Sequence, residues 1–297
     1  MNALPEDIPT DFSRRFIPEH LTPLFFTPSY ETLGEEQRLR YNQLHALYFN
    51  EQITFFEQAM ARHILSALLH RSECASLQES LESFLDEEMR HTAMFRELNR
   101  RCAPEFYGTA EHYFIKPPPG SVAVLRWLAS RPWRFPFFIW IMLMQEERAM
   151  YYAKQFLRST EPLEPHFVAV QRKHLADEVD HVRWDEDLLQ CLWVPATRAK
   201  RRINARLFAW MMGEFFLGPK RAGLNVVRQL AREFPELLPS LPEMRQQLRS
   251  LEHNQQFQLA LYARSIVPRT FAHFDRWPEF AALGRVFPGY TNLAGAK

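Results

Sequence analysis

The sequence predicts an all-α protein with a four-helix core and additional C-terminal helices. The 297 residues include only 9 glycines. Long stretches carry apolar residues at intervals of three and four, which is the spacing of one helix face. No segment shows the strict alternation of apolar and polar residues that is typical of a half-buried strand. No shift in composition marks a second domain, so we expect a single domain over residues 1–297.

The first hairpin of the core is expected to follow an N-terminal arm. Residues 1–30 carry several prolines and little periodicity, so we expect an arm that lies over the body. Residues 35–69 contain almost no helix breakers. After a short polar joint at 70–76, a second helix should run to Cys102, because Pro104 stops it. Residues 103–120 are expected to be a loop.

The second hairpin and the C-terminal third are divided in the same way by prolines and polar joints. Helical stretches are expected at 121–158 (interrupted at Pro132 and Pro136), 166–193, 197–217, 219–233 and 241–265. Residues 268–297 are aromatic and contain prolines, so we expect an irregular tail. Helices joined by short loops pack as antiparallel neighbours. Residues from about 40 to 195 should therefore form the core bundle, and residues 197–297 accessory helices and the tail.

Composition and charge exclude several classes of function. The chain has 36 basic and 35 acidic residues, whereas proteins that bind nucleic acid are usually more basic. The three cysteines show no CxxC spacing, which is typical of a reducing compartment. The most apolar run, 135–144, is about half as long as a membrane span. We expect a cytoplasmic protein without nucleic-acid or membrane partners.

Two copies of a Glu-x-x-His motif point to a metal site. They are Glu88-x-x-His91 and Glu178-x-x-His181. Residues three apart lie on one helix face, so both side chains of a copy can approach one ion. Carboxylate oxygens and neutral imidazole nitrogens are ligands for iron or manganese.

Each motif has a glutamate 31 residues upstream, in apolar surroundings: Glu57 for the first copy and Glu147 for the second. Each of these glutamates lies about as far before its joint as the motif lies after it, so an antiparallel hairpin brings them level. Two such hairpins place four glutamates and two histidines in a bundle core, as in di-iron carboxylate proteins.

Three neighbouring acids compete for these positions. Glu51 lies six residues before Glu57 and is expected at the wrong height. Glu87 has no histidine three residues later, although it could pair with His91. Glu146 should point about 100° away from Glu147. We therefore favour Glu57, Glu88 and Glu147 over them.

The second copy also contains His174, four residues before Glu178 and on the same helix face as Glu178 and His181. The first copy has Phe84 at the matching position. An asymmetric site with four glutamates and three histidines is therefore expected.

The order Glu57, Glu88-x-x-His91, Glu147, His174-x-x-x-Glu178-x-x-His181 resembles the p-aminobenzoate N-oxygenase (AurF-like) family. The resemblance covers roughly residues 40–190, and the HxxxExxH stretch is its most specific part. It implies a ferritin-like helical fold and a dinuclear iron site with a third histidine. It also implies O2-dependent oxidation of a primary amine, either an arylamine or an amine derived from an amino acid, to a hydroxylamine, nitroso or nitro product. A role in natural-product biosynthesis would follow.

Four further residues could support the ligands. Ligating imidazoles usually donate their second N–H to a carboxylate or carbonyl group. Asp185 is four residues from His181, and Asp177 three from His174. Tyr151 is four residues from Glu147, and Glu214 lies in an apolar helix where it needs a partner. Solvated acids and ordinary core packing are the plainer interpretations of these residues.

Other functions remain open on sequence grounds. Asp86-Glu87-Glu88-Met89-Arg90-His91 resembles the EExRH stretch of acyl-carrier desaturases, so a desaturase or hydroxylase acting on a carrier-bound acyl chain is one alternative; His174 argues against it. A ferroxidase or iron-storage protein and a metal-free helical binding protein are two others. No flavin or iron–sulfur motif is present, so an external reductase is expected. Two iron ions, or manganese in their place, a small-molecule amine that a carrier protein could present, and a homodimer complete the expectations.

Overall fold

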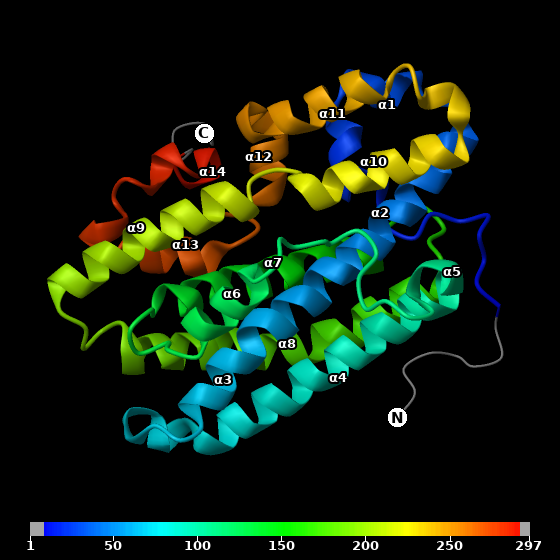
Figure 1. Cartoon of the computed structure of the whole chain (residues 1–297). Helices are drawn as coiled ribbons and strands as arrows, with labels where there is room; N and C mark the ends of the chain where they lie inside the picture. Colours follow the sequence, from blue (N-terminus) through cyan, green and yellow to red (C-terminus); the bar gives the residue numbers. More distant parts are fainter. Residues whose placement is uncertain (1–8, 292–297) are drawn as a thin grey trace.

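Helices form all the regular structure of the residues that the computed structural model describes, 9–291 (Figure 1). Within this range the only β contacts are two isolated bridges, between Arg15 and Leu163 and between Ala263 and Gly289. The predicted all-α class is confirmed. None of the helices in this range is long and apolar enough to cross a bilayer.

Two hairpins form the core. The first pairs α4 with a long helix that starts as α2, passes through one π-helical segment, η3, and continues as α3. The second pairs α7 with α8, and α4 packs against α8 to join the hairpins. The bounds are α2 Glu35–Phe56, η3 Glu57–Ala61, α3 Arg62–Leu68, α4 Gln78–Cys102, α7 Phe137–Arg158 and α8 Pro165–Leu192.

The N-terminal arm packs on the body, as expected, over the part that the structure describes; residues 1–8 lie outside it. The side chain of Asn42 on α2 accepts hydrogen bonds from the backbone N–H groups of Phe16 and Ile17 and donates one to the Ile17 carbonyl. Phe16 stacks on Phe167 of α8. The arm continues through short helical turns: η1 Glu19–Leu21, η2 Pro23–Phe26 and α1 Pro28–Thr32.

Short helices occupy the joint of the first hairpin and the segment before the second: η4 Ser72–Leu77, α5 Pro104–Tyr107 and α6 Ser121–Ala129. Glu51 of α2 fixes the irregular chain between α5 and α6. Its buried carboxylate accepts hydrogen bonds from the Tyr107 hydroxyl and from the backbone N–H groups of Tyr113, Phe114 and Ile115. Glu51 thus has a structural partner set of its own, consistent with its exclusion as a ligand.

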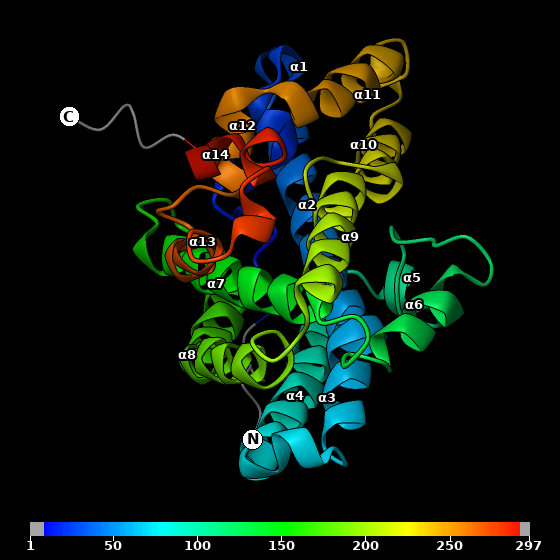
Figure 2. The same cartoon turned by 90° about the vertical axis from the view of Figure 1, so that its left-hand side faces the viewer.

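The C-terminal third covers α7 and α2 on the side away from α8. In Figures 1 and 2, α7 lies between α8 and the accessory helices α9 and α13, and both accessory helices contact α7. The helices are α9 Arg198–Phe215, α10 Arg221–Glu233, α11 Leu241–Ser250, α12 Gln255–Leu261, α13 Pro268–Phe274 and α14 Pro288–Thr291. Short turns η5 Pro235–Leu237, η6 Leu251–His253, η7 Pro278–Phe280 and η8 Leu283–Arg285 connect them.

Two expectations for this region were wrong. The helix expected over 241–265 is divided into α11 and α12, because Asn254 leaves the helical conformation and its side chain caps α12 by accepting from the Phe257 N–H. The tail beyond residue 268 is not irregular within the described range. Its aromatic residues pack on α7 and α8: Phe274 lies 5.2 Å from Trp140, and Phe280 stacks on Trp193.

Candidate metal centre

Seven buried side chains with ligand-type atoms converge in the core. Glu57 begins η3, Glu88 and His91 are on α4, Glu146 is on α7, and His174, Glu178 and His181 are on α8. They form three overlapping groups: Glu57, His91 and His174; Glu88, His91 and His181; and Glu146, Glu178 and His181. Within each group the ligand atoms lie within 4.8 Å of one another. Shared histidines join the groups into one cluster, which we call the carboxylate–histidine cluster.

Glu178 occupies the middle of this cluster. Its Oε1 lies 2.6 Å from His174 Nε2, and its Oε2 lies 3.5 Å from His181 Nδ1. His181 Nδ1 is in turn 3.4 Å from Glu88 Oε1. Despite these short distances, neither oxygen of Glu178 is in a hydrogen bond.

Further buried atoms of the cluster have no hydrogen-bond partner: Glu88 Oε2 and the Nδ1 atoms of His91, His174 and His181. Buried polar atoms are rarely left unpaired, because each costs free energy that a partner would offset. Carboxylate oxygens and imidazole nitrogens suit iron and manganese. The donor set and its unpaired atoms therefore fit metal ions.

The protonation preferences of the carboxylates reflect their crowding. Burial, followed by neighbouring carboxylates such as Glu178, raises the pKa of Glu57, Glu88 and Glu146 well above the usual value. For Glu178, burial also favours the neutral form. His174, a hydrogen bond from Glu146 and His181 outweigh it and hold the pKa well below the usual value. A site that gathers this much potential negative charge favours cations.

Two acids hold the motif histidines across the helix interface. Asp177 Oδ2 lies 3.0 Å from His91 Nε2, and Glu87 Oε2 lies 3.0 Å from His181 Nε2. A carboxylate accepts, so Nε2 carries the proton in both rings, and Nδ1 is left to act as a ligand. Each histidine is thus supported by the residue that precedes the glutamate of the opposite motif.

This crossed arrangement corrects one expectation and adds one residue. Asp177 was expected to support His174 on its own helix, but it supports His91. Glu87 had been considered only as a partner of His91 and was missed as the support of His181. The sequence did contain a signal, because an acid precedes the motif glutamate in both copies.

Glu147 is not part of the cluster, so its predicted placement was wrong. Its carboxylate accepts hydrogen bonds from the backbone N–H groups of Arg269 and Thr270 and from the Thr270 hydroxyl, at 2.7 to 2.8 Å. It therefore caps the N-terminal end of α13. Glu146, one residue earlier, takes the position in the cluster.

The cause lies in the first hairpin. There the helix contains the π-helical segment Glu57–Ala61, whereas α7 is α-helical throughout. A π turn holds more residues than an α turn, and the joints of the two hairpins also differ in length. Equal counts of 31 residues therefore do not give equal phases, and neighbouring residues on an α-helix differ by about 100°. Glu57 itself begins the π segment and accepts a hydrogen bond from Thr92 Oγ1 at 2.6 Å.

Three further supporting residues do not make the expected contacts. Asp185 is fully buried, but neither of its oxygens is hydrogen-bonded, and Glu87 is the partner of His181. Burial, together with Glu178, raises the pKa of Asp185 well above the usual value. Tyr151 follows Glu147 on the helix face away from the cluster and contacts the ring of Tyr152. Glu214 is exposed.

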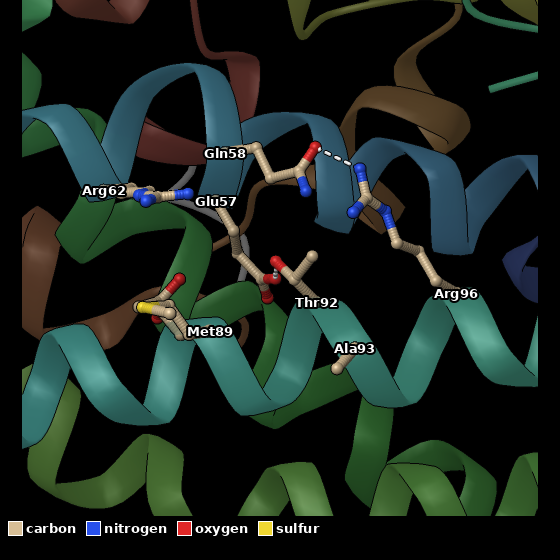
Figure 3. Close-up of a pocket in the computed structure, with 8 residues that line it drawn as sticks. Glu57, Gln58, Arg62, Met89, Thr92, Ala93 and Arg96 are labelled. Atoms are coloured by element: carbon tan, nitrogen blue, oxygen red, sulfur yellow. Dashed lines mark hydrogen bonds between the residues drawn. The ribbon is translucent and has the colours of Figure 1, made fainter. Parts of the chain in front are cut away.

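A cavity of about 170 Å³ adjoins the cluster between η3 and α4 (Figure 3). Glu57 and Glu88 line it together with Thr92 and two arginines, Arg62 and Arg96. Arg96 donates to Gln58 Oε1 and pairs with Glu111. The cavity gives small molecules a route to the glutamate side of the cluster.

The family model of the p-aminobenzoate N-oxygenase AurF matches residues 3–262. The chain belongs to this family. The match extends well beyond the core bundle and includes α9 to α12. The AurF family is a family of oxygenases, and the resemblance read from the ligand motifs is confirmed. No curated protein matches the chain.

Proposed function

We propose that the protein is an O2-dependent di-iron N-oxygenase that oxidises a primary arylamine. The observation that carries the proposal is the carboxylate–histidine cluster with its unpaired buried ligand atoms, in a chain of the AurF family. The proposed ligands are Glu57, Glu88, His91, Glu146, His174, Glu178 and His181. When bound, two iron ions would supply the activation of O2. Formation of the hydroxylamine consumes two electrons and two protons: RNH2 + O2 + 2 e⁻ + 2 H⁺ gives RNHOH + H2O.

The protein's own residues would prepare the site for this reaction. Asp177 and Glu87 fix the orientation and tautomer of His91 and His181, which keeps Nδ1 available in both rings. The packed rings of Phe84 and Phe95 shield the histidine side, since Phe84 stacks on His181 and Phe95 lies edge-on to His174. Water would thus be excluded on that side, and the substrate would enter from the glutamate side.

The cavity favours an amine that carries an acidic group. Arg62 and Arg96 line it on either side of Glu57, and guanidinium groups bind carboxylates with two parallel hydrogen bonds. An aminobenzoate offers both the amine and the carboxylate. Its flat ring also matches the narrow space between η3 and α4.

The test loads the metal-free protein anaerobically with Fe(II), counts iron per chain, and then adds 18O2 and p-aminobenzoate with a chemical reductant. We expect two irons per chain and an 18O-labelled hydroxylamine or nitro product detected by mass spectrometry. His174→Ala should keep the fold and lose the labelled product, while His253→Ala, a change of an exposed histidine on the surface, should behave as wild type. Two irons with ferric product alone would instead indicate a ferroxidase, and oxidation of a carrier-bound acyl chain a desaturase; either result overturns the proposal.

A further inference from the structure

The outer face of α9 carries apolar and basic side chains that the described part of the chain leaves uncovered. Ile203 and Trp210 are 59% and 55% exposed, and Phe215, also exposed, meets Trp210 edge-on at 5.9 Å. Single exposed apolar residues are normal on a surface. Here an exposed tryptophan and isoleucine share one helix with a row of arginines.

Arg198, Arg202 and Arg206 form that row. They are spaced four residues apart, so they lie on one side of α9, and all three are exposed. None of them has an ion pair or a ring contact with any of the described residues. Arg201, by contrast, pairs with Glu279 and lies over the ring of Trp277. We call Arg198, Arg202, Ile203, Arg206 and Trp210 the α9 face; the exposed Glu214 is the only acid beside it.

The position of these charges is unfavourable for the helix itself. α9 has no acidic residue in its first turn, and Arg198 and its basic neighbours lie at the end where the helix dipole is positive. Cations there cost about 0.3–1 kcal/mol each. The row therefore does not serve the stability of α9, which suggests a role in binding.

A second copy of the chain is a poor occupant for this face. Across a two-fold axis the same patch meets itself, so the three arginines of each copy would come close to those of the other. An acidic protein surface complements the row instead. Arginine and tryptophan are also the residues that contribute most to binding energy in protein interfaces.

The proposed function, on which this inference rests, names the kind of partner that is required. Two electrons must arrive for each O2 consumed, and the sequence has neither a GxGxxG nor a CxxC pattern that would indicate a redox cofactor of its own. α9 packs directly on α7, and α7 carries Glu146 of the cluster. Packed helix axes are ~8–10 Å apart, so a protein bound to α9 lies about two helix layers from the cluster (Figure 2).

We propose that the α9 face is the docking surface for an acidic electron-transfer protein that delivers electrons to the metal centre. Charge attraction would steer the two proteins together, and Trp210 and Ile203 would form the dry centre of the contact.

The experiment measures how fast a reduced, acidic [2Fe–2S] ferredoxin reduces the iron-loaded, oxidised protein under anaerobic conditions. The test variant carries Arg198→Glu, Arg202→Glu and Arg206→Glu. The matched control carries Arg232→Glu, Arg249→Glu and Arg276→Glu, which are exposed arginines without printed ion pairs on other parts of the surface and give the same change in net charge. Reduction by dithionite, which needs no docking, is measured for all three proteins.

We expect the test variant to be reduced by ferredoxin at least tenfold more slowly than wild type at low salt, as is typical when electrostatic steering is lost. The wild-type rate should fall with added salt, and the control variant should stay within twofold of wild type. Trp210→Ala should slow the reaction without changing its salt dependence. Glutamates at the start of α9 favour the helix, so misfolding does not explain a loss, and dithionite reduction should be equal in all variants.

Three results overturn the proposal. The first is equal ferredoxin rates in wild type and test variant. The second is an equal loss in the control variant, which shows an effect of net charge alone. The third is a change in oligomeric state of the test variant, which shows that the face binds a second copy. Amine oxidation driven by dithionite reports on the proposed function separately, because it does not depend on the α9 face.

Discussion

Adjacent glutamates on α7 should respond to substitution in opposite ways. Glu147 accepts three hydrogen bonds from the start of α13. Glu147→Ala removes this cap and leaves the Arg269 and Thr270 N–H groups without their acceptor. Loss of a cap and of hydrogen bonds to a charged group should lower the free energy of unfolding by about 3 kcal/mol. With an unfolding entropy of ~0.6 kcal/mol/K for a chain of this length, the Tm should fall by about 5 °C.

Glu146→Ala should do the reverse. It removes one of several crowded, buried carboxylates, so the metal-free protein should be as stable as wild type or more stable. Bound iron should fall from two ions per chain to one or none. Thermal unfolding without metal and iron counting after loading measure both effects, and Glu147→Gln, which keeps one acceptor oxygen, is the control. Loss of iron in Glu147→Ala with an unchanged Tm would refute the assignment of the two residues.

Three further outcomes follow from the structure. Glu87→Gln or Asp177→Asn should weaken iron binding 10- to 100-fold by metal titration, and unchanged affinity in both would show that the crossed pairs do not support the histidines. Glu51→Ala should lower the free energy of unfolding in urea by about 3 kcal/mol, because the backbone N–H groups of 113–115 lose a charged acceptor; Glu36→Ala, an exposed change, should have little effect. Burial, followed by the charge of Arg148, lowers the pKa of His45 to about 3. Only the unfolded chain therefore binds this proton between pH 6.5 and 3, and wild type should lose about 1.4 kcal/mol per pH unit relative to His45→Asn as the pH falls; parallel stability profiles would contradict this.

Much of the fold could be predicted from the sequence because helix breakers and apolar spacing are local signals. α4 ends at Cys102, before Pro104, as expected. The division of 241–265 was missed because Asn254 is a weak signal inside an otherwise helical pattern. The tail was missed because its helical turns are stabilised by packing on Trp140 and Trp193, which are distant in sequence.

The candidate site was predictable as far as spacing within one helix determines it. Glu88 with His91, and His174 with Glu178 and His181, share helix faces by arithmetic alone. Contacts between helices were not predictable in the same way. Asp177 was assigned to a histidine on its own helix, because only the structure reveals which rings of α4 face α8.

The π-helical segment Glu57–Ala61 separates two sets of contacts along one continuous helix. Upstream, Asn42 and Glu51 hold the N-terminal arm and the chain before α6; downstream, α3 packs against α4. The extra residue of the π turn fixes the rotation between these two halves. A deletion of one residue within 57–61 would restore a regular α-helix and rotate one half by about 100° relative to the other. The segment therefore acts as a phase setting that single substitutions can preserve, whereas a change in its length would misalign the arm, the connecting chain and the ligand Glu57 together.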